Sequence, residues 1–212
     1  NLLPTCVNNV ETLAIGTALL THGVERYLSY GTNECPGTKI ISVAGNVNNP
    51  GVYEIPFGIT VKEIINDIAG GIRGDKQLNL FQIGGASGKV GPASLADTPF
   101  TYDDLHKVDL VIGSGAVLVV DEDTSALEFI RSIQEFFCHE SCGKCTPCRE
   151  GNKQITHILD RIAEGTTKDT DLDTLVRFAN IMKKASFCGL GETAQSALLN
   201  TLKFFPEEFG IK

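Results

Sequence analysis

The chain has 212 residues, of which 42% are hydrophobic and 21% charged, and this length suffices for one large domain or two small ones. Its formal net charge of −8 argues against nucleic acid and anionic lipid as partners, because both favour a basic protein surface. The longest apolar run, near residues 111–120, contains glycines and is about half as long as a membrane span, so we expect no direct membrane insertion.

Residues 1–36 contain one predicted helix, Val10–Leu20, whose apolar residues lie roughly on one side. This segment is too short to fold as an independent domain. The sequence also starts without a methionine or a basic leader. We therefore expect the chain to be a piece of a longer polypeptide, and we expect residues 1–36 to be the end of a domain whose main part lies upstream.

Residues 37–120 show a mixed pattern of strands and one helix. Two stretches rich in β-branched residues, Lys39–Val43 and Val52–Ile55, flank a run of turn-forming residues and predict a hairpin. The stretch Val61–Ala69 has the apolar spacing of an amphipathic helix, with Thr60 as its N-cap. Further strands are predicted at Leu80–Ile83 and Ala116–Val120. A hairpin, a helix and then more strands is the order of a β-grasp, ubiquitin-like fold.

Residues 121–212 are predicted to be helical, so the whole chain is predicted to be an α+β protein that ends in a helical bundle. Helices are expected at residues 125–137, 147–163, 171–184 and 193–204. Thr146 and Pro147 are typical of an N-cap and a first helical position, and the second of these helices should begin there. The acidic run at residues 121–123 is predicted to be a solvated linker before the first helix.

Seven cysteines are present, and four of them lie within residues 138–148. Without a visible secretion signal, such crowding is typical of metal or cluster ligation in a reducing cytosol, which predicts a cytoplasmic location. Cys142, Cys145 and Cys148 follow each other at steps of three, so a short loop can offer three thiolates to one compact cluster. The adjacent helix start and two basic neighbours would stabilise the negative charge of a thiolate-bound cluster.

Other chemistries fit this spacing less well. Structural zinc sites are usually built from two separate CxxC knuckles, and the second knuckle is missing. Disulfides between cysteines three apart are strained and belong to redox motifs in another setting. A two-cluster ferredoxin would place its fourth cysteine a few residues after Cys148, where Gly151, Asn152 and Lys153 stand instead. The spacing therefore favours a single cluster with one remote ligand.

The remote ligand is predicted to be Cys188, because flanking glycines leave its backbone free to approach a cluster. Cys138, Cys6 and Cys35 are the alternatives, and each fits better as a small buried or half-exposed thiol. His139 lies beside the cysteines, but imidazole ligation is uncommon for an ordinary 4Fe-4S cluster. We expect His139 to be a neighbouring or surface residue.

Four segments of the sequence resemble a known family, the flavin subunit of NADH dehydrogenases. These segments are Asn8–Thr12, Gly45–Tyr53, Gly113–Gly115 and Glu140–Gly151, the last with the sequence ESCGKCTPCREG. The family includes the flavin subunit of respiratory complex I and the NAD(P)-linked subunits of soluble hydrogenases and formate dehydrogenases. The match covers essentially the whole chain, and the cysteine segment is its most specific part.

The resemblance implies three parts with different roles. They are the C-terminal end of an FMN/NADH-binding domain (residues 1–36), an SLBB β-grasp domain (residues 37–120) and a helical 4Fe-4S-binding domain (residues 121–212). In this family FMN accepts a hydride from NADH, and a 4Fe-4S cluster then receives single electrons. The family's cluster ligands correspond to Cys142, Cys145, Cys148 and Cys188. Its asparagine pair near the FMN phosphate corresponds to Asn8 and Asn9, and Thr12 is a weaker match.

One part of the family pattern is missing. The family's glycine-rich flavin and nucleotide loops precede its Asn-Asn-Val-Glu-Thr motif, and they have no counterpart in this sequence. The short glycine runs at residues 84–88 and 113–115 lack the context of a nucleotide-binding loop and are predicted to be turns. We therefore expect the chain alone to bind neither NADH nor FMN and to be inactive without the rest of the enzyme.

The resemblance also predicts partners and a subfamily. The partners would be other redox subunits, including a small thioredoxin-like 2Fe-2S subunit. Residues 188–194, with the sequence CGLGETA, are more similar to the soluble hydrogenase and formate dehydrogenase branch than to complex I. The predicted function is electron transfer between FMN and a 4Fe-4S cluster in an NAD(P)H-linked oxidoreductase. The alternative is a ligand- or partner-binding β-grasp module with a structural zinc site.

Overall fold

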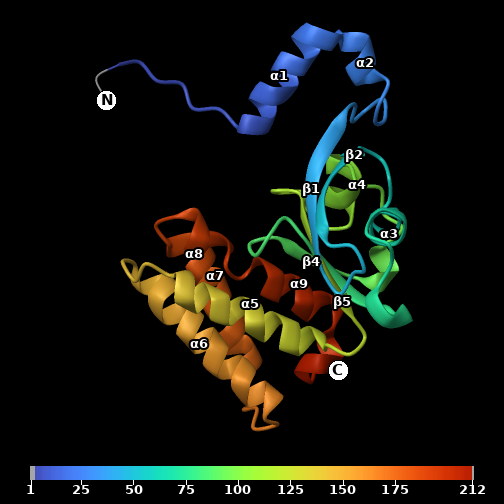
Figure 1. Ribbon diagram of the computed structural model, residues 1–212. Helices are drawn as coiled ribbons and strands as arrows, with labels where there is room; N and C mark the ends of the chain where they lie inside the picture. The colour runs from blue at the N-terminus through green and yellow to red at the C-terminus, as the bar shows by residue number, and fades with distance from the viewer. Residues whose placement is uncertain (1–2, 212) are drawn as a thin grey trace.

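The computed structural model describes residues 3–211 and has three regions: an N-terminal helical segment, a sheet with short helices, and a C-terminal group of helices (Figure 1). The helices of the first two regions are α1 (Val10–His22), α2 (Val24–Leu28), α3 (Val61–Glu63) and α4 (Tyr102–Lys107). The strands are β1 (Thr38–Gly45), β2 (Gly51–Pro56), β3 (Leu78–Ile83), β4 (Lys89–Pro92) and β5 (Ala116–Asp121). The helices of the last region are α5 (Ala126–Glu140), α6 (Thr146–Ala163), α7 (Asp171–Ala185), α8 (Gly189–Thr193) and α9 (Ser196–Phe204). Within residues 3–211, no helix is long and apolar enough to cross a membrane.

The sheet has five strands in the order β2-β1-β5-β3-β4. β1 pairs with β5 in parallel, and the other neighbouring strands are antiparallel. In β1, Ile41 and Val43 are buried and Ser42 between them is exposed, because successive side chains of a strand point to opposite faces. The predicted strands are confirmed, and β4 is an additional one. The mixed sheet is thus established, while its assignment to the β-grasp class stays a prediction.

Both faces of the sheet are covered by buried apolar side chains. On one face, Ile41 belongs to the same core cluster as Ile64, which follows α3. On the other face, Leu80 and Val120 belong to a second cluster that includes Phe129 of α5. Figure 1 shows the same arrangement, with α3 on one side of the sheet and the helices from α5 onward on the other. The sheet therefore supports the helical region that carries the cysteines.

The segment predicted as one amphipathic α-helix, Val61–Ala69, is α-helical only in its first turn. Thr60 caps this turn as predicted, and Glu63 completes a capping box with it. The segment Ile64–Ile68 continues as a π-helix, in which the Ala69 N–H donates to the Ile64 carbonyl at 3.0 Å. The apolar spacing therefore predicts the buried residues correctly and the hydrogen-bond pattern wrongly, because the wider turn keeps Ala69 beside Ile64 on the buried face.

The helices predicted at residues 125–137, 147–163 and 171–184 are confirmed as α5, α6 and α7. The N-cap of α6 is Cys145, however, and Thr146 is the first helical residue rather than the cap. The helix predicted at residues 193–204 starts only at Ser196, because a separate short helix, α8, precedes it. These corrections place two of the predicted ligands, Cys145 and Cys188, at helix N-caps.

The acidic run at residues 121–123 is a solvated linker only in part. Asp121 is the last residue of β5 and is buried. Its carboxylate accepts a hydrogen bond from the Asp123 N–H and pairs with Lys76, so the buried charge is compensated. The following residues lead to Ser125, whose hydroxyl caps α5 by accepting from the Glu128 N–H.

The N-terminal helix is confirmed as α1, but it lies outside both core clusters. None of its residues is buried, and Leu20 is 92% exposed. Figure 1 shows α1 and α2 projecting beyond the sheet. Glu11 connects α1 to the sheet, because its carboxylate pairs with Lys39 and accepts from the Ile40 N–H at 3.2 Å.

Candidate iron–sulfur site

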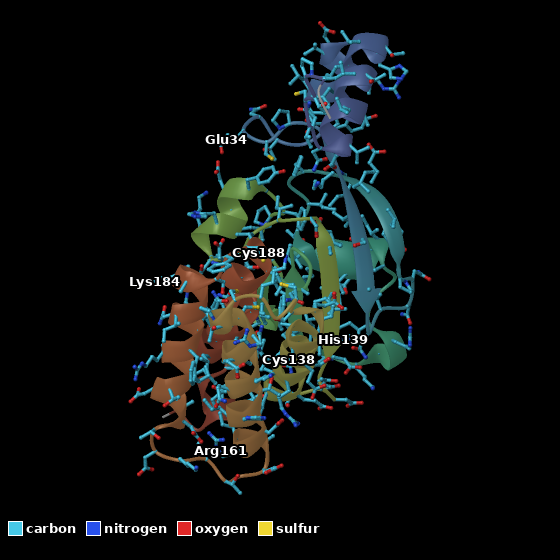
Figure 2. All side chains as sticks on the ribbon, turned by 90° about the vertical axis from the view of Figure 1, so that its left-hand side faces the viewer. Glu34, Cys138, His139, Arg161, Lys184 and Cys188 are labelled. Carbon is cyan, nitrogen blue, oxygen red and sulfur yellow. The ribbon has the colours of Figure 1, made fainter. Side chains whose placement is uncertain are left out.

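The four cysteines predicted as ligands come from three segments and line one cavity of about 90 Å³. Cys142 lies in the loop after α5, Cys145 is the N-cap of α6, Cys148 is in the first turn of α6, and Cys188 is the N-cap of α8. Figure 2 shows Cys188 at the end of the helical region opposite Arg161, which lies near the end of α6. The fold therefore brings together three cysteines of one loop and a fourth that is remote in sequence.

The loop between α5 and α6 is held by hydrogen bonds that leave its thiols free for ligation. Arg149 donates from Nη1 to the Gly143 carbonyl at 2.7 Å, and its Nε pairs with Glu150 at 2.9 Å. Gly143 has a φ of 75°, in the left-handed region that favours glycine. The chain can therefore reverse between Cys142 and Cys145 and direct both thiols toward the same cavity.

Close packing of α8 against α6 completes the cavity. A Cβ atom at Gly191 would lie 3.0 Å from Cys148 Cβ and 2.5 Å from Ser186 Oγ. Position 191 therefore has room only for glycine. Because α8 begins directly after Cys188, this close approach keeps Cys188 and Cys148 at the same cavity although 40 positions separate them in the sequence.

The cavity has a buried side and an exposed side. Cys145 and Cys148 are buried, whereas Cys142 and Cys188 are exposed. Lys144, on the exposed side, also lines the cavity. A group held there would be anchored on its inner side and approachable from solvent on its outer side.

Hydrogen-bond donors surround the inner sulfur of Cys145. The N–H of Phe187 is the main cause that holds the pKa of this thiol below its ordinary value. The N–H of Cys148 and the hydroxyl of Ser186 act in the same direction, against the effect of burial. Donors of this kind favour a thiolate, which is the form that ligates metal.

The other inner sulfur, that of Cys148, has two side-chain donors. Burial raises the pKa of Cys148, and the hydroxyl of Ser141, 3.3 Å from its Sγ, opposes that shift. Asn152 donates from Nδ2 to the same sulfur at 3.4 Å. The sequence analysis missed both residues, although Asn152 follows Cys148 by four positions and so lies one helical turn further along α6.

The spread of the four cysteines bears on whether the site fits a single ion or a cluster. A tetrahedral zinc site with Zn–S bonds of about 2.3 Å needs its sulfurs about 3.8 Å apart. In the part of the chain that the structure describes, no group of three His, Cys, Asp or Glu side chains is placed to hold one ion. The four thiols nevertheless share one cavity, which fits a cluster that offers a separate iron to each cysteine. The arrangement therefore fits an iron–sulfur cluster and lends the zinc alternative no support.

The remaining cysteines and His139 do not line this cavity. Cys138 lies on α5 with its Sγ 3.3 Å from the hydroxyl of Thr156 on α6. Figure 2 shows Cys138 and His139 along the same helix, and His139 is exposed. Cys6 is exposed and Cys35 is half-buried, both in the segment before β1.

The residues predicted near FMN lie at the start of α1. Asn8 is exposed, and its Nδ2 donates to Cys6 Sγ at 3.2 Å. Asn9 is the N-cap of α1 and accepts from the Glu11 N–H at 2.8 Å, a structural role that was not predicted. Thr12 is exposed in the first turn. A groove of about 950 Å³ runs between α1, α2 and the first two strands, and Asn9 lines it whereas Asn8 and Thr12 do not.

Comparison with known protein families places the two structured parts of the chain. Residues 128–212 match the family described as the NADH-ubiquinone oxidoreductase-F iron-sulfur binding region, and residues 40–91 match the SLBB domain. The chain therefore carries an SLBB domain and the iron–sulfur region of this oxidoreductase family. This confirms the resemblance that the sequence motifs indicated, including an iron–sulfur group in the helical part.

Curated relatives come from both hydrogenases and quinone oxidoreductases. The NADP-reducing hydrogenase subunit HndC of Solidesulfovibrio fructosivorans is 38% identical over 97% of this chain and 42% of its own length. The F-type subunit of the NADH-quinone oxidoreductase of Escherichia coli (strain K12) is 37% identical over 99% of this chain and 48% of its own length. The chain thus spans less than half the length of these relatives.

A solved structure supports the same relationship at the level of the fold. The crystal structure of an NAD+-reducing NiFe-hydrogenase in the H2-reduced state matches with a TM-score of 0.82 and 31% identity. The match covers 97% of this chain and 35% of the hydrogenase chain. The sheet and the iron–sulfur region are therefore arranged as in that hydrogenase.

Proposed function

We propose that Cys142, Cys145, Cys148 and Cys188 hold one 4Fe-4S cluster, through which the chain transfers single electrons in an NAD(P)H-linked flavin oxidoreductase. The observation that carries this proposal is the convergence of four cysteines from three segments on one cavity. The match to the iron–sulfur family of NADH-ubiquinone oxidoreductases supports it. When bound, a 4Fe-4S cluster supplies one-electron transfer, with a potential that the surrounding protein adjusts.

The residues around the cavity divide the work between its two sides. On the buried side, the N–H and hydroxyl donors near Cys145 and Cys148 stabilise the negative charge of thiolates. On the exposed side, Cys142 and Cys188 form the part of the site that a donor or acceptor of electrons can approach most closely. Lys144 at the rim adds positive charge near the thiolates.

The three regions of the fold support the domain division proposed from the sequence. Residues 1–36 would complete an FMN/NADH-binding domain, because a helix with several apolar side chains and none buried is typical of a surface covered by another part of the protein. Asn8, Asn9 and Thr12 would then lie at the rim of the FMN site. Residues 37–120 would form the SLBB β-grasp domain that positions the other parts, and residues 121–212 would hold the cluster. FMN and NAD(P)H would bind only in the full-length protein.

The same reasoning leads to a proposal on partners and location. We place the protein in a cytoplasmic complex with other redox subunits, including a small thioredoxin-like 2Fe-2S subunit. The segment Cys188–Ala194 favours the soluble hydrogenase and formate dehydrogenase branch over complex I. Two matched proteins with hydrogenase in their descriptions are consistent with this branch, although the quinone oxidoreductase relative of E. coli is almost equally similar.

Metal analysis of the anaerobically purified chain tests the proposed cluster. We expect about four iron and four sulfide per chain, a brown colour, and an EPR signal that appears on reduction. Reduced FMN added in solution should bleach the visible absorption as electrons pass to the cluster. A colourless protein with one zinc per chain would establish the zinc-binding module instead.

Flavin analysis of the same preparation tests the domain division separately. We expect the chain alone to retain no FMN and to oxidise no NADH, because hydride transfer requires flavin and nicotinamide held in contact. Stoichiometric FMN in the purified chain would contradict the proposed domain division and leave the proposed cluster site intact.

A further inference from the structure

Two buried amides connect α5 to the inner sulfur of Cys148. Asn152 donates from Nδ2 to Cys148 Sγ at 3.4 Å, and Gln134 donates from Nε2 to Asn152 Oδ1 at 2.7 Å. The exposed fractions of Asn152 and Gln134 are 0% and 1%. Buried amides without partners are costly, so the contacts that these two groups make are expected to be specific.

The direction of both hydrogen bonds follows from the chemistry of the sulfur. A thiolate that ligates iron has no proton and can only accept a hydrogen bond. Asn152 must therefore turn its NH2 group toward Cys148, which leaves its oxygen facing α5. Gln134 must in turn present its own NH2 group to that oxygen. The orientation of both amides in the structure is the one that a ligating Cys148 requires.

A hydrogen bond to a ligating sulfur acts on the redox equilibrium. Reduction adds one negative charge to the cluster and its sulfurs, and a donor stabilises the more negative state more strongly. Because the donor is buried, water does not screen its effect. Groups that contact a ligand rather than the metal regularly tune metal sites in this way.

We propose that Asn152, held in place by Gln134, raises the reduction potential of the cluster through its hydrogen bond to Cys148. Both amides are positioning residues, because they act through a ligand and touch no reacting atom themselves. This inference rests on the proposed ligation by Cys148. It extends that proposal by naming the residues that set how readily the site accepts an electron.

The inference is distinguished from a purely structural role by the potential. If Asn152 only fills space between α5 and α6, its replacement lowers stability and leaves the potential of the intact cluster unchanged. If it donates to Cys148, its replacement lowers the potential even in protein that keeps its full iron content. The measurement is therefore a redox titration followed by EPR, with each sample normalised to its iron and sulfide.

The main variant is Asn152→Leu, which keeps a branched side chain of similar size and removes the donor. We expect its equilibrium constant for reduction to fall about three- to tenfold, equal to about 30–60 mV for a one-electron couple. Gln134→Met should shift the potential in the same direction by less, because Asn152 keeps its donor but loses its anchor. Gln154→Leu, an exposed position on the same helix, is the matched control and should leave the potential unchanged.

A measurement on the unaltered protein covers the case in which Asn152→Leu fails to fold. With only the side-chain nitrogen of asparagine labelled with 15N, pulsed EPR of the reduced protein should detect a 15N nucleus coupled to the cluster. Absence of that coupling, or an unchanged potential in Asn152→Leu with full iron content, would overturn the inference. If the unaltered protein contains no iron and sulfide, the proposed function itself fails, so the two failures are distinguishable.

Discussion

The helices α1 and α6 use their apolar residues in opposite ways. More than half of the side chains in α1 are apolar, yet none of its residues is buried. α6 is more polar, and its buried residues are Cys148, Gly151, Asn152, Ile155, Ile158 and Leu159. The comparison teaches that the spacing of apolar residues, rather than their number, determines which helix enters the core of this chain.

The buried face of α6 also explains why the site is well ordered. Cys148 and Asn152 lie on the same helical face as Ile155 and Leu159, at successive steps of four, three and four residues. The packing that holds α6 in the second core cluster therefore also fixes the inner sulfur and its amide donor. α1 has no such support, and its only strong link to the sheet in the described structure is Glu11.

Loss of the remote ligand should have the largest effect on this contrast. We expect Cys188→Ala to lose the 4Fe-4S cluster or convert it to a 3Fe form, because three thiolates remain for four irons. Since the cluster ties α6 to α8, its loss should also lower the melting temperature of the helical region. Iron content, the EPR signal of the reduced protein and thermal unfolding under anaerobic conditions measure both effects.

Cys138→Ala is the matched control for this change. Cys138 contacts Thr156 on α6 and does not line the cavity, so iron content and the EPR signal should stay nearly unchanged. If iron is lost on changing Cys138 and retained on changing Cys188, the assignment of the site is wrong.

A cavity in the core of α6 should produce the next largest effect. Ile155 is fully buried on the face that carries Cys148, so Ile155→Ala should reduce the free energy of unfolding by about 2–5 kcal/mol. The apparent melting temperature, compared at one scan rate, measures the change. A decrease of less than 1 kcal/mol would mean that this face of α6 is not the support that the comparison assigns to it.

Overpacking at the contact between α8 and α6 should have a smaller effect. Gly191→Ala places a methyl group against Ser186 and Cys148, and such overpacking typically costs about 1–3 kcal/mol. Cluster occupancy should fall together with stability, because the displaced neighbour is a proposed ligand. Gly189→Ala, in the same helix, meets nothing within 4 Å and should leave both quantities unchanged. Equal effects of the two substitutions would contradict the close packing inferred at position 191.

Much of the site could be predicted from the sequence because its signals are local. Three cysteines at steps of three and a fourth between glycines predict a shared site, and the structure places all four at one cavity. Gln134 could not be found in this way. It reaches Asn152 across the interface between α5 and α6, and no local pattern specifies which residues of two helices meet there.

The fold shows the same division between local and long-range signals. The long amphipathic helices α5, α6 and α7 were predictable from their periodicity. β4 was missed because Gly91 and Pro92 are unfavourable in strands, and the strand is possible here because it lies at the edge of the sheet. Its pairing with β3 depends on a contact that the short segment itself does not encode.

The smallest effect is expected at α1. Leu20 is 92% exposed, so its side chain meets water in the folded and the unfolded chain alike, and replacing it removes little burial. We therefore expect Leu20→Ser to change the free energy of unfolding of this chain by about 0.5 kcal/mol or less. Thermal unfolding beside Ile155→Ala measures the difference between the two helices directly. If residues 1–36 complete a flavin domain, the same substitution should be more destabilising in the full-length protein, where another surface would cover Leu20. A large loss already in this chain would show that α1 packs here, and the contrast with α6 would no longer hold.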